Sequence, residues 1–169
     1  MHPRAEELVR QLELEPHVEG GHYRRIYESS LQCAFGEQGR MRAVATSIYY
    51  LLNAGESSRW HRVDADELWH WYEGDAIELL RFDPRDRHLT RHTLGPVGHG
   101  RAPVFVVPAG CWQAARPLGA YALVGCTVAP GYEWRGFSTL DCAPDIAAQL
   151  GAIDPLLLLD LRLALHRVA

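Results

Sequence analysis

Apolar and polar residues alternate along most of this chain in short runs, which is the period of half-buried β-strands. The stretch 22–29 (HYRRIYES) alternates in this way, and 43–52 (AVATSIYYLL) is rich in the β-branched and aromatic residues that strands favour. Further stretches of the same kind follow at short spacing: 57–63, 67–72, 76–82, 87–94, 104–107, 111–115 and 120–128. The pattern therefore predicts nine or ten short strands.

Turn-forming residues separate these strands. The clearest turns are 64–66 (DAD), 73–75 (EGD) and 83–86 (DPRD), and residues 35–41 form a glycine-containing loop. Many short strands with a turn about every ten residues are typical of an all-β sandwich or barrel.

Helical spacing occurs only near the two ends of the chain. Residues 4–13 place leucines four apart among charged residues, which predicts a short surface helix. Near the other end, 144–150 and 154–167 look helical, the first starting at Pro144 and the second at Pro155, each a favourable first-turn residue. We therefore expect one domain over residues 1–169, with a barrel over about 18–140 and a helical C-terminal extension over about 144–167.

Composition narrows the class of protein. A chain of 169 residues with 47% hydrophobic and 22% charged residues can bury a full core, as a soluble globular domain does. Its formal net charge of -4 and the absence of a basic stretch argue against nucleic acid or an anionic membrane as partners. The charged, amphipathic N-terminus does not resemble a secretory signal, so we expect a cytoplasmic protein.

Two residue types exclude specific chemistries. All 17 basic residues are arginine, so a lysine Schiff base, covalently attached pyridoxal phosphate and a P-loop are excluded. The four cysteines, Cys33, Cys111, Cys126 and Cys142, include no C-x-x-C pair and are expected to be reduced thiols.

One stretch concentrates residues that carry chemistry, and its spacing resembles a known family. Between Gly55 and Gly74, His61 and Glu67 fit the first cupin motif, G-x5-H-x-H-x3,4-E-x6-G. Val63 stands where that motif has its second histidine. The stretch 108–113 (PAGCWQ) resembles the second motif, with Gln113 in place of its histidine.

Longer phrases strengthen the resemblance. They are PHVEGGHYRRIYES, TSIYYLL, SSRWHRVDADELWHWYEG, VVPAGCWQAA and LVGCTVAPGYEWRGF, and they resemble a small-cupin branch of unknown function over about residues 12–140. The resemblance implies a double-stranded β-helix, or jelly roll, with a short N-terminal helix and C-terminal helices. It also implies a homodimer and an overall shape like that of the RmlC-type sugar-nucleotide 3,5-epimerases.

In a jelly roll, alternate strand residues point into the barrel. We therefore expect Glu67, Trp69 and Trp71 to point inward together with His61, and Gln113 to join them from the second motif. A mostly apolar cavity with a few converging polar groups is the usual form of a small-molecule site.

These residues admit a metal-dependent hypothesis. His61, Glu67 and Gln113 would be the ligands of a divalent transition metal, although Val63 cannot coordinate and a neutral amide is a weak ligand. His70 could join them only if a bulge turned it inward, and we expect it to lie in the sheet or an interface instead.

A second hypothesis needs no metal. His61 would act as a general acid or base near neutral pH, and burial would raise the pKa of Glu67. Arg59 or Arg62 would clamp an anionic substrate, and Tyr49 or Tyr132 would donate a proton. The expected activity is that of an isomerase or epimerase acting on a carbohydrate-like metabolite.

A third hypothesis is a binding module without catalysis, which would use the same cavity.

The remaining candidate residues are interpreted as structural. Cys111 is expected to be a core residue, the Glu19–Gly20–Gly21 segment an unusual turn, and Trp60, Trp112 and Trp134 packing residues.

Overall fold

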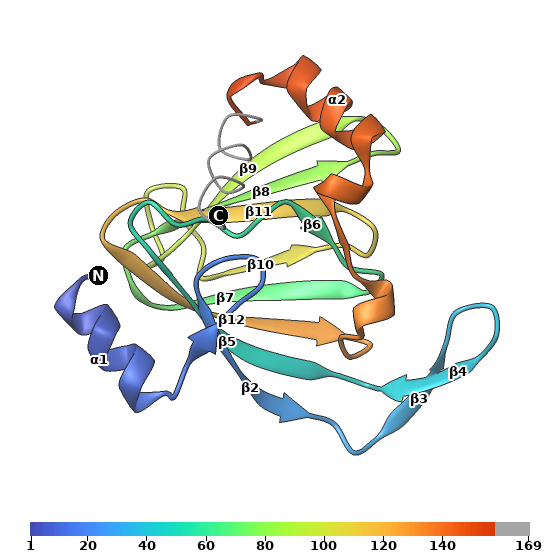
Figure 1. Ribbon diagram of the computed structural model, residues 1–169, viewed down its shortest axis with the longest axis horizontal. Helices are drawn as coiled ribbons and strands as arrows, with labels where there is room; N and C mark the ends of the chain where they lie inside the picture. The colour runs from blue at the N-terminus through green and yellow to red at the C-terminus, as the bar shows by residue number, and fades with distance from the viewer. Residues whose placement is uncertain (158–169) are drawn as a thin grey trace.

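The computed structural model describes residues 1–157, and two antiparallel β-sheets form its body (Figure 1). The first sheet has six strands, in the spatial order β1 (Glu15–Pro16), β2 (His22–Glu28), β5 (Thr46–Asn53), β12 (Tyr121–Ala129), β7 (Asp66–Gly74) and β10 (Val104–Val107). The second has five, in the order β13 (Ser138–Thr139), β6 (His61–Arg62), β11 (Trp112–Pro117), β8 (Ile77–Asp83) and β9 (His88–Leu94). The predicted all-β jelly roll is confirmed.

The main core lies between the two sheets. Inward-facing residues of the first sheet, such as Tyr50, Trp69 and Val124, pack against Ile77 and Leu79 of the second. Each of these side chains is almost fully buried. They sit at alternate positions of their strands, as the pleat of a sheet requires.

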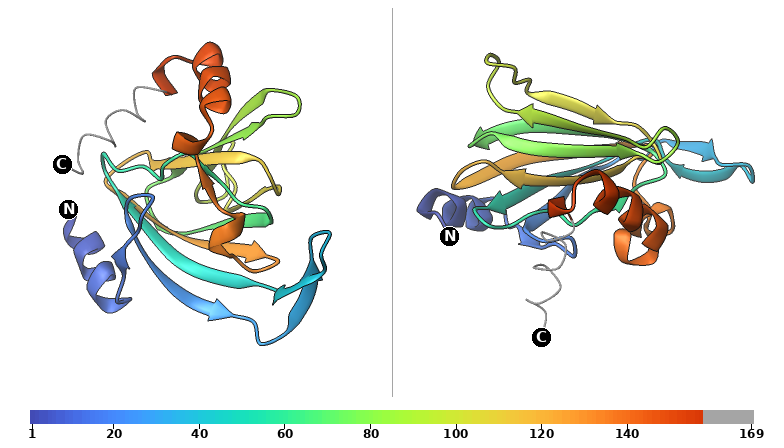
Figure 2. Two further views of the ribbon diagram at one scale, coloured as in Figure 1. Left: turned by 45° about the vertical axis from the view of Figure 1, so that its right-hand side comes forward. Right: turned by 90° about the horizontal axis from the view of Figure 1, so that it is seen from above.

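Terminal helices cover the outer face of each sheet (Figure 2). Helix α1 (Pro3–Gln11) buries Ala5 and Leu8 against Leu51 and Leu123 of the six-stranded sheet. Helix α2 (Pro144–Ile153) packs Leu150 on the apolar outer side of the five-stranded sheet. Two short 3-10 helices, η1 (Trp134–Gly136) and η2 (Leu140–Cys142), lead into α2.

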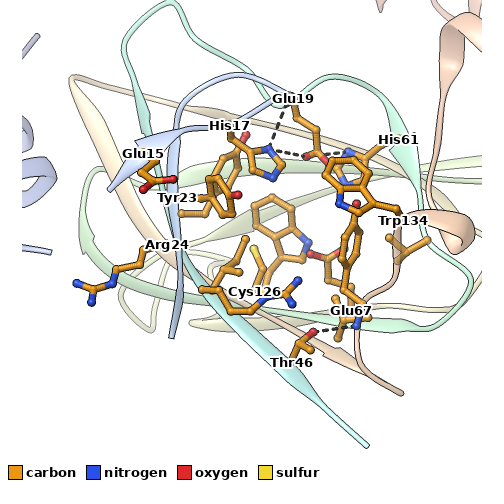
Figure 3. Close-up of a pocket in the computed structure, with 17 residues that line it drawn as sticks. Glu15, His17, Glu19, Tyr23, Arg24, Thr46, His61, Glu67, Cys126 and Trp134 are labelled. Carbon is orange, nitrogen blue, oxygen red and sulfur yellow. Dashed lines mark hydrogen bonds and ion pairs between the residues drawn. The ribbon is translucent and has the colours of Figure 1, made fainter. Parts of the chain in front are cut away.

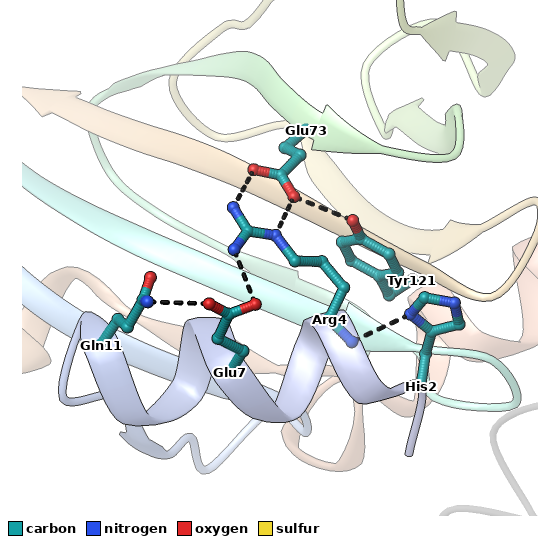
Figure 4. Close-up of polar contacts among 6 residues, drawn as sticks. All are labelled: His2, Arg4, Glu7, Gln11, Glu73 and Tyr121. Carbon is teal, nitrogen blue, oxygen red and sulfur yellow. Dashed lines mark hydrogen bonds and ion pairs between the residues drawn. The ribbon is translucent and has the colours of Figure 1, made fainter.

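A polar network fastens α1 to the sheet (Figure 4). The Arg4 guanidinium donates hydrogen bonds of 2.7 and 3.0 Å to the Glu73 carboxylate at the end of β7. It also pairs with Glu7 on the same helix, and the Tyr121 hydroxyl donates to Glu73. The helix is therefore held by a bidentate ion pair in addition to the packing of Ala5 and Leu8.

Two segments differ from the sequence prediction. Of the strand predicted over 57–63, only β6 (His61–Arg62) forms, because the backbone before it makes isolated hydrogen bonds, from the Ser58 amide to the Ala115 carbonyl and from the Arg59 amide to the Glu19 carbonyl. The loop predicted over 35–41 lies at the tip of a hairpin of β3 (Gln32–Phe35) and β4 (Arg40–Ala43), which projects from the body in Figure 1. Most of the helix predicted over 154–167 lies outside the described residues. Within residues 1–157, no helix is both long and apolar enough to cross a membrane.

Candidate functional site

A cavity of about 300 Å³ opens between the first sheet and the segment that carries His61 (Figure 3). Its inner wall comes from neighbouring strands in register, because Cys126 pairs with both Trp69 and Ile48, and Val128 pairs with Glu67. The cavity is lined by Glu15, His17, Glu19, Tyr23, Arg24, Arg25, Thr46, Ile48, Tyr50, His61, Val63, Glu67, Trp69, Cys126, Val128, Tyr132 and Trp134. The site thus combines aromatic and aliphatic walls with five carboxyl or imidazole groups.

Glu67 is the titratable group best matched to neutral pH. Its side chain is buried in the inner face of β7, and burial raises its pKa to about 7. Hydrogen bonds from the Gln113 amide and the Cys126 thiol lower that pKa only in part. Glu67 therefore exists in both protonation states at physiological pH.

Gln113 stands directly behind Glu67. Its amide nitrogen donates a short hydrogen bond to Glu67 Oε2, and its amide oxygen accepts one of 2.9 Å from the Trp69 indole. Gln113 also pairs with His61 across β11 and β6. The structure thus brings His61, Glu67 and Gln113 together, with Gln113 orienting the carboxylate from outside the cavity wall.

His61 is buried and electrically neutral at physiological pH. Its Nδ1 lies 2.7 Å from the carbonyl oxygen of Arg59, so Nδ1 carries the proton and Nε2 is left as a hydrogen-bond acceptor. Burial lowers its pKa to about 4. His61 is therefore not the group that titrates near neutrality, which corrects the role expected from the sequence.

Glu19 is a major site residue that the sequence prediction missed. Its carboxylate is 8% exposed and lies 3.3 Å from His61 Nδ1 and 3.8 Å from His17 Nδ1. Burial, and next the charge of Glu67, raise the pKa of Glu19 well above its ordinary value. Two carboxyl groups with raised pKa values and two neutral imidazoles therefore surround the inner cavity.

The two glycines after Glu19 explain how it reaches this position. Gly20 and Gly21 both have positive φ, of 106° and 67°, and a Cβ at Gly21 would collide with the carbonyl oxygen of Leu51. A Cβ at Gly20 would collide with the carbonyl oxygen of Ser57, and beside this close approach the Arg59 amide donates a 2.9 Å hydrogen bond to the Glu19 carbonyl. A Glu-Gly-Gly sequence immediately before a strand is the signal that would have indicated it.

Four predicted site residues lie elsewhere. Tyr49 and His70 point to the outer face of the first sheet, where each packs on Tyr72, because strand alternation places them opposite Tyr50 and Trp69. Trp71 does point inward, but its indole donates to the Asp75 carbonyl beyond the cavity. Arg59 contributes backbone groups rather than a guanidinium to the described site.

Tyr132 and Trp134 complete the cavity on its open side. Tyr132 lines it as predicted, and burial raises the pKa of its phenol. Trp134 was expected to be a packing residue, yet its side chain is 63% exposed at the cavity rim. It meets Tyr132 and Phe137 edge to face, and Phe137 in turn stacks on His61.

The side chains at the cupin ligand positions do not fit a metal ion. Val63 lines the cavity with an apolar surface, and both polar atoms of Gln113 are already hydrogen-bonded to protein. Among residues 1–157, no group of three His, Cys, Asp or Glu side chains is arranged to hold one. Two ligands, His61 and Glu67, fall short of the usual coordination shell.

Fold and site together define a cupin-type β-barrel with a polar cavity. The family model described as Cupin superfamily (DUF985) matches residues 6–140, and the chain belongs to that family. A hypothetical protein from Leishmania major is 30% identical, with a TM-score of 0.75 over 90% of this chain and 93% of its own. Protein SO0799 from Shewanella oneidensis is 38% identical, with a TM-score of 0.71 over 80% and 83% of the two chains.

A more distant similarity shows the fold alone. Bacillus subtilis oxalate decarboxylase, a protein with Mn(II) centres, is 18% identical, with a TM-score of 0.54 over 78% of this chain and 31% of its own. No curated protein matches this chain.

Proposed function

We propose that this protein is a small-molecule enzyme of isomerase or epimerase type, which moves a proton on a polar metabolite without metal ligands of its own. The observation that carries the proposal is Glu67, a buried carboxyl in the cavity wall with a pKa of about 7. A group that titrates near the working pH is the most effective general acid or base.

Glu67 supplies the base in the proposed reaction. Its carboxylate takes a proton from a carbon next to a carbonyl, the C–H bond breaks, and the electron pair moves toward the carbonyl oxygen. Glu19, whose pKa burial raises well above its ordinary value, supplies an acid that donates a proton to that oxygen. For isomerisation, protonated Glu67 gives its proton to the neighbouring carbon; for epimerisation, a water molecule protonates the other face of the original carbon and Glu67 gives its proton to solvent. In both cases the enol hydroxyl returns its proton to Glu19, so both carboxyl groups are regenerated.

The other polar groups position these two carboxyls. Gln113 fixes the orientation of Glu67 through its hydrogen bond, and Trp69 fixes Gln113 in turn. His61 lies beside Glu19 and offers Nε2 as an acceptor for a substrate hydroxyl. A cavity of about 300 Å³ is at the small end of ligand sites, which favours a compact metabolite.

Solvent deuterium exchange tests the proposal. Candidate hydroxy-carbonyl metabolites are incubated with the protein in D₂O at pD 7.5 with a chelator present, and deuterium at carbon is followed by NMR. We expect incorporation with the native protein and a loss of at least about 100-fold with Glu67→Gln. Glu37→Gln, an identical change at an exposed hairpin turn, should leave the rate unchanged.

Two results would contradict the proposal. If exchange occurs only when a divalent metal is added, the reaction belongs to the metal-dependent class. If metabolites bind but none exchanges, the cavity serves as a binding module.

A further inference from the structure

Arg25 is a cationic side chain on the cavity side of β2. It pairs with Ile48 of β5, whose side chain packs against the main core. Because paired residues of antiparallel strands share a face of the sheet, Arg25 is directed toward the cavity, which it lines. Burial raises the pKa of the Tyr132 phenol, and the charge of Arg25 offsets part of that rise, so the guanidinium acts on the cavity wall.

The neighbouring arginine is turned the other way. Arg24 pairs with Tyr49, whose side chain lies on the outer face of the sheet. Its guanidinium forms an ion pair with Glu13 at 2.5 Å, and Figure 3 shows its side chain directed out of the cavity. Arg25 is therefore the cavity arginine that can meet a bound molecule.

Arg25 itself is only weakly engaged. Its Nη1 pairs at 2.8 Å with Glu28, three residues along the same strand, and the two side chains are 42% and 57% exposed. Ion pairs this exposed hold their partners weakly, since water screens them. Within residues 1–157, the Nε and Nη2 atoms of Arg25 have no hydrogen-bond partner. That edge of a guanidinium binds two oxygens of a carboxylate or phosphate, as Arg4 binds Glu73.

Two phenols supply further donors beside Arg25. Tyr23 and Tyr132 both line the cavity. The Tyr23 ring meets His17 edge to face at 4.5 Å, and the Tyr132 amide donates a 2.9 Å hydrogen bond to Thr46. These contacts leave the hydroxyls unused, since neither has a hydrogen-bond partner among the described residues. Arg25 and Tyr23 both act electrostatically on Tyr132, which places the three groups at one part of the cavity.

We propose that Arg25, with the hydroxyls of Tyr23 and Tyr132, binds a carboxylate or phosphate group of the substrate. A guanidinium and hydroxyl donors are complementary to an oxyanion, and a partly enclosed site strengthens their attraction. Glu19 and Glu67 also act electrostatically on Tyr132, so the anion site adjoins the two carboxyls that transfer protons. This inference rests on the proposed function, for which it names the substrate class: a compact hydroxy-carbonyl metabolite with an acidic group.

Three compounds with one carbon skeleton test the inference on the intact protein. Glycerol, glycerate and glycerol 3-phosphate are each titrated by calorimetry at pH 7.5. We expect one or both anions to bind at least about tenfold more tightly than glycerol, and the tighter anion names the acidic group. Glycerol binding as tightly as both anions, or no binding by either anion, would overturn the inference.

Two variants of opposite effect locate the site. Arg25→Met keeps the apolar stem and removes the charge, so anion affinity should fall at least about tenfold while glycerol affinity stays within about twofold. Glu28→Gln removes the competing carboxylate, so anion affinity should rise severalfold. Arg10→Met and Glu37→Gln make the same charge changes at exposed positions elsewhere and should change nothing. Anion affinity unchanged in Arg25→Met, or altered as much in the controls, would overturn the inference.

The phenols are tested in the same titration. Tyr23→Phe and Tyr132→Phe each remove one hydroxyl that has no partner among the described residues, so neither change should destabilise the fold. Together they should weaken anion binding at least about threefold, and unchanged affinity would overturn the part assigned to the hydroxyls.

The two proposals fail separately. If an anion binds through Arg25 but no metabolite exchanges deuterium, the anion site stands and the catalytic proposal falls. If a metabolite without an acidic group exchanges through Glu67 and no anion binds, the catalytic proposal stands and the anion site falls.

Discussion

Glu67→Gln should stabilise the fold, and the gain should grow with pH. The pKa of Glu67 is about 7 in the folded chain and about 4.5 in a solvated glutamate. The folded state therefore binds this proton more tightly than the unfolded state does. The stabilising contribution of the protonated carboxyl is complete below pH 4.5 and is lost as the pH rises to 7.

The size of the effect follows from the same two values. A difference of one pKa unit corresponds to about 1.4 kcal/mol, so a shift from 4.5 to about 7 corresponds to about 3 kcal/mol. Glutamine resembles the protonated carboxyl and can still accept the Gln113 hydrogen bond. The variant should therefore match the native protein near pH 4.5 and exceed its free energy of unfolding by about 3 kcal/mol above pH 7.5.

Urea unfolding at half-unit intervals from pH 5 to 8.5 measures this difference. The comparison of two proteins is needed because His17 and His61, with pKa values near 4, destabilise the native fold as the pH falls below 6.5. That loss is common to both proteins and cancels in the difference. A difference that stays flat within about 1 kcal/mol over this range would show that the Glu67 pKa is not raised. Glu37→Gln should show such a flat profile.

Three further predictions concern other parts of the chain. Gly21→Ala should destabilise the fold by more than about 2 kcal/mol in urea unfolding, because its Cβ would collide with the Leu51 carbonyl at a positive φ; a neutral result would mean that the turn can shift. His61→Ala should abolish deuterium exchange while circular dichroism stays native; loss of the fold would make this histidine structural. Arg4→Met should speed amide hydrogen exchange in α1 selectively, since it breaks the bidentate pair with Glu73; unchanged protection would show that the apolar contacts suffice.

Strand alternation made much of the barrel predictable. Residues 66–74 and 121–129 pair as long strands, as their composition predicted, because β-branched and aromatic residues suit a buried pleated surface. The cupin-like spacing also identified His61 and Glu67, because both fit the first cupin motif between Gly55 and Gly74. The site was therefore found in outline from the sequence.

Other features could not be read from the pattern. Thr46–Asn53 is largely apolar on both faces, because α1 covers its outer side at Leu51 while the core covers its inner side at Tyr50. Period-2 alternation then fails to say which tyrosine faces the cavity, and Tyr49 was chosen instead of Tyr50. Only the docking of the helix on one side and the second sheet on the other decides the matter.

The sequence by itself indicated most of the strands and turns, because these follow from local periodicity, and its resemblance to the cupin motif identified His61 and Glu67. Tertiary structure decided the chemistry. Glu19 arrives from a turn more than forty residues away in sequence, and its burial, together with the charge of Glu67, raises its pKa. Burial likewise raises the pKa of Glu67. Proton affinity depends on desolvation and on neighbouring charge, which exist only once the chain has packed.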